Sequence, residues 1–350
     1  MDLISILNEI RLLVDLDSIK NETSELQKKI FKAPQKKSIS YKLNGNKQTI
    51  SKELIITELQ QILKTKTLER TRYYLSRLIK SLEIRKEGKL NDINLNRWKE
   101  YDDILTDSLW IFDKRDTSGV HKADYWGNFI PQIPNQLLRR YTKKGEWVLD
   151  PFLGSGTTLI ECRRLGRNGL GVELNNETAK TAKRVTNKET NKYSVTTKIL
   201  RDNSGSIDFK TKLQKFKIKS FQFMILHPPY WDIIKFSRKK EDLSNAGSVQ
   251  EFLNLFGKVI ENAYPYLDKG RYCAVIIGDK YSSGEWIPLG FYVMQTMLKR
   301  GFKLKSTIIK NFDQTTAKRN QKELWRYRAL AGGFYVFKHE YIFLFQKTGE

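Results

Sequence analysis

A histidine, two prolines and two aromatic residues stand in a row in the segment ILHPPYWDII, residues 225–234. Two consecutive prolines cannot continue a central strand, because each lacks a backbone N–H and fixes φ. The chain must therefore leave a sheet here in a stiff turn. Such a turn fixes the positions of the groups on either side of it, His227 and Tyr230, as a binding or catalytic site requires.

A second group with chemical potential lies in VLDPFLGSGTTLIE, residues 148–161. Asp150 ends an apolar strand, and Gly154 and Gly156 allow a tight turn and close approach of a ligand before a helix begins. Glu173 ends the next strand about 20 residues on, an arrangement that suits ribose hydroxyls. Neither glycine-rich phosphate motif, G-x-G-x-x-G or G-x-x-x-x-G-K-[ST], is present. Asp150 would repel a phosphate and could attract a ligand's ammonium group.

From about residue 120, strands alternate with helices, which predicts an α/β fold with a mostly parallel sheet wound on both faces. An antiparallel edge is expected near the C-terminus. Ligands bind such sheets at the carboxyl ends of the strands, near the switch point of strand order. Strands are predicted at residues 146–152, 168–175, 194–202, 221–229, 270–279, 302–312 and 338–347, and helices at 156–166, 176–190, 249–267 and 288–301.

The first 107 residues are predicted to be mostly helical, with a loop or hairpin around Asn44-Gly45. Two helices around residues 64–67 could form a helix-turn-helix that directs its arginines to nucleic acid. A helical bundle that packs on the next domain or on a partner is the favoured alternative. We expect a helical region at 1–107, in contact with DNA or a partner, and a second domain at 108–350.

The composition excludes several classes of protein. Hydrophobic residues make up 39% of the 350 residues, enough for a core, and no apolar run approaches the roughly 20 residues of a membrane span. Cys162 and Cys273 lie far apart, and only three histidines are present. We therefore expect no metal site and no membrane contact, and reduced cysteines in a cytoplasmic protein.

Positive charge is concentrated in the second domain. The chain carries a net charge of +24, and residues 1–120 hold 23 basic against 18 acidic side chains. Residues 180–240 hold 16 basic and 4 acidic side chains, and residues 299–328 hold 10 and 2. A basic surface of this size predicts a polyanionic partner and binding that weakens as salt rises.

The strings DPFLGSGTT, GVELN and HPPYW together resemble the S-adenosylmethionine-dependent methyltransferases that modify exocyclic amino groups of bases in DNA. The resemblance covers about residues 108–345 and implies a Rossmann-like methyltransferase sheet with S-adenosylmethionine as cofactor. It places Glu173 at the ribose, Asp202 at the adenine amino group, and a methionine-side motif at residues 121–141. The cofactor-binding residues that it implies are Asp150, Pro151, Phe152, Gly154, Gly156, Thr157, Glu173, Asp202, His121 and Phe129, with Tyr125 and Pro131 as further contacts.

In the second loop the resemblance assigns catalysis to His227, Pro228, Pro229 and Tyr230. An exocyclic amine is a poor nucleophile, so catalysis must hold it in line with the methyl group and accept its hydrogen bonds. Tyr230 would stack on a base flipped out of the helix, and Trp231 would line the pocket or pack beneath it.

The family pattern has Asp, Asn or Ser where this chain has His227. A neutral imidazole can accept one hydrogen bond, so activity should fall as the pH drops through its pKa, and a profile flat to about pH 5 would argue against this role. In the alternative, the backbone carbonyl between Pro228 and Pro229 accepts the hydrogen bond of the amine, and His227 is only a spacer. Asp or Asn usually accompanies adenine N6 and Ser cytosine N4. Histidine fits neither, and we favour adenine slightly as the commoner target.

The preferred DNA-contact segment is residues 311–334, where basic residues stand among Trp325 and Tyr327; a basic surface helix is the alternative. The basic residues 232–248 could also contact DNA. DNA is the expected partner, with a cognate restriction endonuclease or a partner subunit. An RNA base methyltransferase and a non-catalytic nucleic-acid-binding subunit are competing functions. The predicted DNA-binding residues are Lys318, Arg319, Lys322, Arg326 and Arg328.

Overall fold

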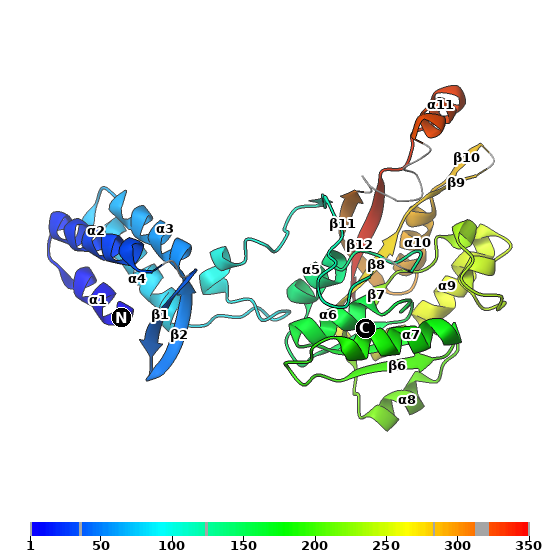
Figure 1. The fold of residues 1–350 in the computed structure, drawn as a ribbon, viewed down its shortest axis with the longest axis horizontal. Coiled ribbons are helices and arrows are strands. Elements are labelled where there is room, and N and C mark those ends of the chain that lie inside the picture. Colours follow the sequence, from blue (N-terminus) through cyan, green and yellow to red (C-terminus); the bar gives the residue numbers. More distant parts are fainter. Residues whose placement is uncertain (1, 35–36, 123–124, 283, 312–321, 349–350) are drawn as a thin grey trace. The chain divides into compact units, whose positions relative to one another are not determined.

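The computed structural model describes residues 2–34, 37–122, 125–282, 284–311 and 322–348. They form two compact units, Met1–Asp103 and Ile104–Glu350, each with its own hydrophobic core (Figure 1). Among the described residues no helix is both long and apolar enough to cross a membrane.

The N-terminal unit is a helical bundle with a β-hairpin. Its helices bury one apolar stripe each, and side-chain caps mark their starts: Asp15 accepts from the Ser18 N–H and Thr67 from the Arg70 N–H. The hairpin turns at Asn44-Gly45, where both residues have positive φ (48° and 78°). The elements are α1 (Leu3–Leu12), α2 (Leu16–Lys32), β1 (Ser38–Leu43), β2 (Asn46–Ser51), α3 (Lys52–Leu63), α4 (Leu68–Glu83) and the 3-10 helix η1 (Leu95–Glu100).

The arginines that a helix-turn-helix would direct to nucleic acid make contacts within the N-terminal unit, although Arg70 is exposed. Arg77 donates to the buried Glu58 at 2.6 Å, and Arg72 donates to the Leu13 carbonyl at 2.8 Å. Arg70 lies over the ring of Tyr74 at 4.9 Å. These contacts favour a packing role for the two helices around residues 64–67.

The C-terminal unit is built on an eight-stranded sheet in the order β3-β11-β12-β8-β7-β4-β5-β6. Strands β8, β7, β4, β5 and β6 run parallel, while β12 pairs antiparallel with both β8 and β11 toward the other end of the sheet. The mostly parallel sheet and its antiparallel pairing near the C-terminus are therefore confirmed. The strands are β3 (Leu109–Trp110), β4 (Trp147–Asp150), β5 (Asn168–Glu173), β6 (Thr197–Arg201), β7 (Phe221–Leu226), β8 (Leu267–Ile277), β11 (Phe302–Asn311) and β12 (His339–Lys347).

Helices cover both faces of the sheet (Figure 1). On one face α5 (Gln132–Tyr141) and α6 (Thr157–Leu165) pack on β4 and β7 through Leu137, Val148 and Phe223, and α7 (Asn176–Lys188) lies beside α6. On the other face, Phe209, Phe256 and Val293 belong to one apolar cluster. They come from α8 (Phe209–Phe216), α9 (Val249–Ala263) and α10 (Leu289–Leu298).

Two elements stand apart from these layers. The hairpin β9 (Lys280–Ser282) and β10 (Glu285–Ile287) and the helix α11 (Lys322–Gly332) extend beyond the same end of the sheet (Figure 1). Tyr281 on β9 stacks on Phe334 at 4.0 Å between ring centroids, which ties the hairpin to the segment after α11.

The order of strands reverses between β4 and β7, which are neighbours in the sheet. After β4 the chain proceeds to β5 and β6 on one side, and after β7 to β8 on the other. The loops that follow β4 and β7 therefore leave the sheet together at the switch point, where doubly wound folds bind ligands.

Candidate active site

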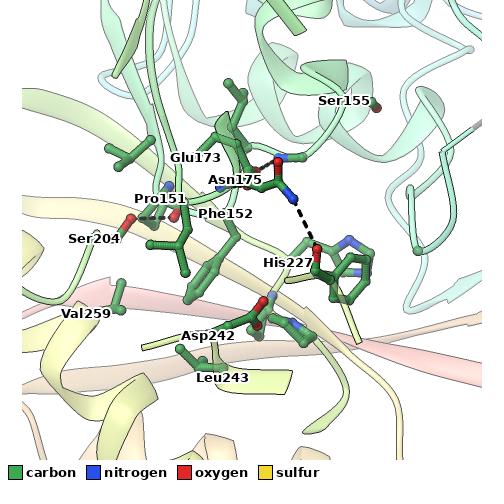
Figure 2. A pocket seen from close by; sticks show the side chains of 18 of the residues that line it. Pro151, Phe152, Ser155, Glu173, Asn175, Ser204, His227, Asp242, Leu243 and Val259 are labelled. Atoms are coloured by element: carbon green, nitrogen blue, oxygen red, sulfur yellow. Dashed lines mark hydrogen bonds between the residues drawn. The ribbon is translucent and has the colours of Figure 1, made fainter. Parts of the chain in front are cut away.

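A pocket lies at the carboxyl ends of β4, β5, β6 and β7 (Figure 2). Its space is about 820 Å³, including the part that is open to solvent. The loops after these strands supply most of its wall. The lining includes Pro151, Phe152, Ser155, Glu173, Asn175, Ser204, His227, Asp242, Leu243 and Val259.

The loop between β4 and α6 needs its glycines. Gly154 and Gly156 have φ of 53° and 91°, a region that disfavours side chains. A Cβ on Gly156 would lie 2.9 Å from the Thr186 hydroxyl, and one on Gly154 would lie 3.1 Å from the ring of Tyr125. Gly154 therefore lines the pocket with bare backbone, whereas Gly156 makes the tight start of the helix.

Asp150 lies beneath this loop and does not line the pocket. Its carboxylate accepts the Phe152 N–H at 3.0 Å and the Thr158 hydroxyl at 2.6 Å, and its side chain is buried. Burial raises the pKa of Asp150 to about 7. A contact with a ligand's ammonium group is thus not what the geometry favours, since both carboxylate oxygens already shape the loop.

Glu173 occupies the end of β5 and lines the pocket, where the sequence places it. Its two carboxylate oxygens accept the Gly154 N–H at 2.9 Å and the Asn175 N–H at 2.8 Å. Burial raises the pKa of Glu173, and the nearby Asp242 adds to that rise. The carboxylate thus links the glycine loop after β4 to the turn between β5 and α7.

At the third strand the wall is formed one residue later than expected. Asp202 follows β6 and accepts the Asn203 N–H at 2.9 Å, but it is Asn203 and Ser204 that line the pocket. The Ser204 hydroxyl donates to the Pro151 carbonyl at 2.6 Å, as Figure 2 shows. The residue that follows a strand end can face either way, which the sequence alone does not reveal.

Two further predicted cofactor residues lie behind the wall. Nε2 of His121 lies 2.7 Å from the buried Glu161, and the Thr157 hydroxyl donates to Asn128 at 2.7 Å. Phe129, by contrast, lines the pocket and meets His227 edge-to-face at 5.0 Å. Of the methionine-side motif, Tyr125 also lines the pocket, whereas Pro131 does not and precedes α5.

The charges on the wall select the kind of ligand. Glu173, Glu241 and Asp242 line the pocket, and no lysine or arginine is found among its described lining residues. Carboxylates repel a phosphate and attract a cation. The pocket therefore suits a nucleoside that carries positive rather than negative charge.

The His-Pro-Pro turn follows β7, and His227, Pro228 and Pro229 line the same pocket as the glycine loop. Tyr230 does not line it. Its hydroxyl donates to Glu340 at 2.6 Å, and its ring lies against Gly278, where a Cβ would come within 2.9 Å. Tyr230 is thus half-buried and held by its hydroxyl and one ring edge, and its stacking on a flipped base stays a prediction.

Trp231 packs beneath the turn. It has a positive φ of 52°, its indole N–H donates to the Ala246 carbonyl at 2.8 Å, and Lys280 lies 4.1 Å over its ring. Lys280 also pairs with Asp232. Of the two sequence-based alternatives, packing beneath the pocket is the one observed.

Part of the segment 232–248 lines the pocket, and its contact with DNA stays a prediction. Phe236, Asp242 and Leu243 line it, and the Asp242 carboxylate accepts hydrogen bonds from Ser237 and Ser244. Sequence reasoning missed these lining residues. The apolar and acidic side chains between the lysines of this segment were the available signal.

Of the predicted DNA-binding residues, Lys318 and Arg319 lie outside the described residues, and Lys322 begins α11. Arg326 and Arg328 are exposed on that helix, and Arg328 lies over Trp325 at 5.2 Å. Leu324, Tyr327 and Leu330 are also exposed. The helix therefore buries little of its own surface within the described residues.

A family model described as DNA methylase (N6_N4_Mtase) matches residues 16–184 and 221–350. The match reaches into the N-terminal unit, which the sequence motifs had left outside the resemblance. Type II methyltransferase M2.DpnII of Streptococcus pneumoniae is 37% identical over 95 residues, which are 26% of this chain and 32% of that protein. M.MjaII of Methanocaldococcus jannaschii is 40% identical over 65 residues, 18% of this chain and 12% of that protein.

M.MthZI of Methanothermobacter thermautotrophicus is 28% identical over 138 residues, 36% of each protein. The chain thus spans between 12% and 36% of the length of these three relatives. Among solved structures, TrmN from Thermus thermophilus aligns with a TM-score of 0.40 and 17% identity, over 63% of this chain and 49% of that one.

Proposed function

Because the chain belongs to the DNA methylase family of amino-methyltransferases, we propose that it transfers a methyl group from S-adenosylmethionine to an exocyclic amino group of a base in DNA. One observation carries this proposal. The glycine loop after β4 and the His-Pro-Pro turn after β7 line one pocket. A site for the methyl donor and a site for the acceptor amine thereby share one space.

The wall of the pocket fits S-adenosylmethionine. When bound, this cofactor supplies an electrophilic methyl group on a positively charged sulfur. Glu173 lies at the strand end that suits ribose hydroxyls, and Phe152 and Leu243 offer apolar surface for an adenine ring. The carboxylates Glu241 and Asp242 suit the positive charge of the sulfonium and the ammonium group.

The His-Pro-Pro turn would hold the target amine. The Pro228 and Pro229 rings restrict the backbone, so that the carbonyl between them and the His227 side chain keep fixed positions. These acceptors would take hydrogen bonds from the amine, which frees its lone pair as the new bond forms. The base must leave the DNA stack to reach this depth.

Exposed basic residues near the end of the sheet support contact with DNA. Arg326 and Arg328 stand on α11, next to the β9–β10 hairpin. Guanidinium groups suit phosphates and guanine edges. We assign α11 and the β9–β10 hairpin to the DNA-contact surface, with Lys318, Arg319 and Lys322 as further members.

Histidine at position 227 matches neither usual pattern, and we favour adenine N6 slightly over cytosine N4 because adenine is the commoner target. Three type II methyltransferases are among the similar proteins. We therefore place the chain in a restriction–modification system, with a cognate endonuclease or a partner subunit as its partner.

The proposal is tested by incubating the purified chain with S-adenosylmethionine labelled in its methyl group. Unmethylated genomic DNA and total tRNA serve as parallel substrates, and the His227→Ala variant as the control. Label in DNA that depends on His227 is expected. Label in tRNA alone would transfer the assignment to an RNA methyltransferase. Bound cofactor without any transfer would indicate a non-catalytic subunit.

A further inference from the structure

Behind the pocket wall, a buried network of four side chains runs from β11 through β12 to the His-Pro-Pro turn. Nζ of Lys310 lies 3.1 Å from Oε1 of Glu340, and both side chains are buried. The Tyr230 hydroxyl donates to Oε2 of Glu340 at 2.6 Å. Nε2 of His227 lies 3.2 Å from the Tyr230 hydroxyl, and the network ends there in the pocket lining.

The direction of each hydrogen bond in this network can be assigned. Glu340 is paired with Lys310, and an ionised carboxylate only accepts hydrogen bonds. The Tyr230 hydroxyl proton therefore points to Glu340, which leaves the phenolic oxygen as an acceptor toward the imidazole. Nε2 of His227 must then carry the proton, and Nδ1 is the unprotonated nitrogen. Nδ1 has no hydrogen-bond partner among the described residues.

We propose that the buried network fixes His227 as the Nε2–H tautomer, so that the lone pair of Nδ1 accepts a hydrogen bond from the target amine. The second half of this statement rests on the proposed methyl transfer. Nδ1 is bonded to Cγ, as is Oδ1 of aspartate or asparagine, so this tautomer presents an acceptor equally far along the side chain. The other tautomer would place an N–H there, a donor facing a donor.

Neutrality alone does not select a tautomer, so the network has a separate task. Burial lowers the pKa of His227 to about 4, against the opposing effect of Glu340 and with the support of Lys310. The ring is thus neutral at physiological pH, and only a bond to one nitrogen decides which of them carries the proton. Tyr230 and Glu340 are positioning residues, because they act through His227.

The tautomer can be measured without any substrate. The chain has three histidines, so the intact protein labelled with ¹⁵N in its imidazole rings gives a simple NMR spectrum, and the His227→Asn variant identifies the signals of residue 227. The wild type is expected to show a protonated Nε2 and an unprotonated Nδ1 between pH 6 and 8. In Tyr230→Phe the acceptor is removed, and both tautomers should be populated.

Tyr341→Phe is the matched control, because Tyr341 lies on β12 next to Glu340 but has no part in the network. Its hydroxyl donates to Asp279 at 3.0 Å. It should leave the His227 spectrum unchanged. Glu340→Gln provides a second disruption if Tyr230→Phe does not fold. A wild-type spectrum with protonated Nδ1, or with both nitrogens protonated at pH 7, would overturn the proposal, as would an unchanged tautomer in both disrupting variants.

Turnover provides the second readout. Tyr230→Phe should lower kcat for DNA methylation by roughly tenfold or more, as loss of an orienting partner does for other catalytic histidines, with the Kd for S-adenosylmethionine unchanged. If kcat stays the same while the tautomer shifts, the role of Nδ1 as acceptor fails. If the wild type shows the expected tautomer but methylates no nucleic acid, the proposed function fails and the tautomer assignment stands.

Discussion

At the scale of single residues, His227 is the feature that departs most from the pattern of the DNA amino-methyltransferases. It lines the pocket beside the two prolines, and its second nitrogen is engaged by Tyr230. In the proposed mechanism its remaining nitrogen is the side-chain acceptor for the target amine. The departure in residue type would then keep the hydrogen-bonding function that the more common residues provide.

Replacing His227 tests this equivalence. His227→Ala removes the side-chain acceptor and should lower kcat by about 10²–10³-fold, the usual effect of removing one such hydrogen bond to reacting atoms. His227→Asn restores an acceptor at the same branch point and should recover a substantial part of the activity. Steady-state methylation of DNA by the two variants, with cofactor binding measured separately, provides the comparison. Equal activity of the wild type and His227→Ala would assign the work to the backbone carbonyl.

The pH dependence follows from burial of the same ring. The pKa of His227 falls from 6.5 to about 4, so the imidazole stays neutral on lowering the pH until it approaches that value. The His227-dependent part of kcat should thus be flat from pH 8 to pH 5 and decrease only below. This revises the expectation from sequence, under which a profile flat to about pH 5 argued against the role. That expectation presumed a pKa near its usual value.

A pH–rate profile of the wild type beside His227→Asn isolates this effect. A loss of activity centred near pH 6.5 that is absent from the asparagine variant would contradict it. A change near pH 7 that both proteins share belongs to another group, and Asp150 is one whose pKa lies there. The protonation of Asp150 also affects stability. Because its pKa in the folded protein is raised above the usual value, its contribution to the free energy of unfolding decreases as the pH rises from about 4 to about 7.

At the scale of elements, α11 and the β9–β10 hairpin carry the proposed contact with DNA. The double variant Arg326→Ala/Arg328→Ala should weaken DNA binding and reduce the slope of log K against log salt by about one for each phosphate that is no longer neutralised. Affinity for S-adenosylmethionine should not change. Fluorescence anisotropy with a labelled duplex at several salt concentrations measures both affinity and slope.

Lys210→Ala/Lys215→Ala on α8 is the matched control, because it removes the same charge from exposed positions on a helix that covers the sheet. If both double variants bind DNA more weakly by the same factor, net charge accounts for binding and α11 has no special part in it.

Much of the sheet could be predicted from sequence because buried parallel strands appear as unbroken apolar runs between helical segments. Residues 223–226 of β7 and 273–277 of β8 are runs of this kind. The α8 helix was not predicted, since only Phe209 and Leu213 of its eight residues are buried. The β9–β10 hairpin was not predicted either, because its strands have three residues each, too few to show an alternation of apolar and polar residues.

The site was less predictable than the sheet, for a geometric reason. Motifs identify the loops but not which of their side chains face the ligand. Asp150 and Asp202, predicted as cofactor contacts, do not line the pocket, whereas Phe152, also predicted, and Asn203, which was not, do. Glu340 could not be foreseen, because its link to Tyr230 arises from strand pairing between distant segments.

At the scale of the whole molecule, charge determines how the chain meets its substrate. The net charge is +24, whereas the pocket is lined by carboxylates. Under the proposed function, the surface would attract the DNA polyanion, and the pocket would accept the cationic cofactor and a neutral base. The molecule would thus meet the two electrostatic demands at separate places.

This division predicts that salt acts on DNA binding and not on the cofactor. Raising salt from 50 to 200 mM should weaken DNA binding by about 10³-fold or more if six or more phosphates are neutralised. Binding of S-adenosylmethionine should change much less, because the pocket shields its charges. Titration calorimetry for the cofactor and anisotropy for DNA at both salt concentrations give the comparison. A parallel loss of both affinities would show that a single surface governs them.

The most direct test of the central claim is to identify the product of the reaction. Unmethylated DNA incubated with the chain and methyl-labelled S-adenosylmethionine is digested to nucleosides and analysed by mass spectrometry. We predict labelled N6-methyladenine, or N4-methylcytosine if the other amino group is the target, and about 10²–10³-fold slower formation of the same product by His227→Ala. Label confined to a ring carbon or to RNA, or no label while S-adenosylmethionine binds, would contradict the proposed methyl transfer.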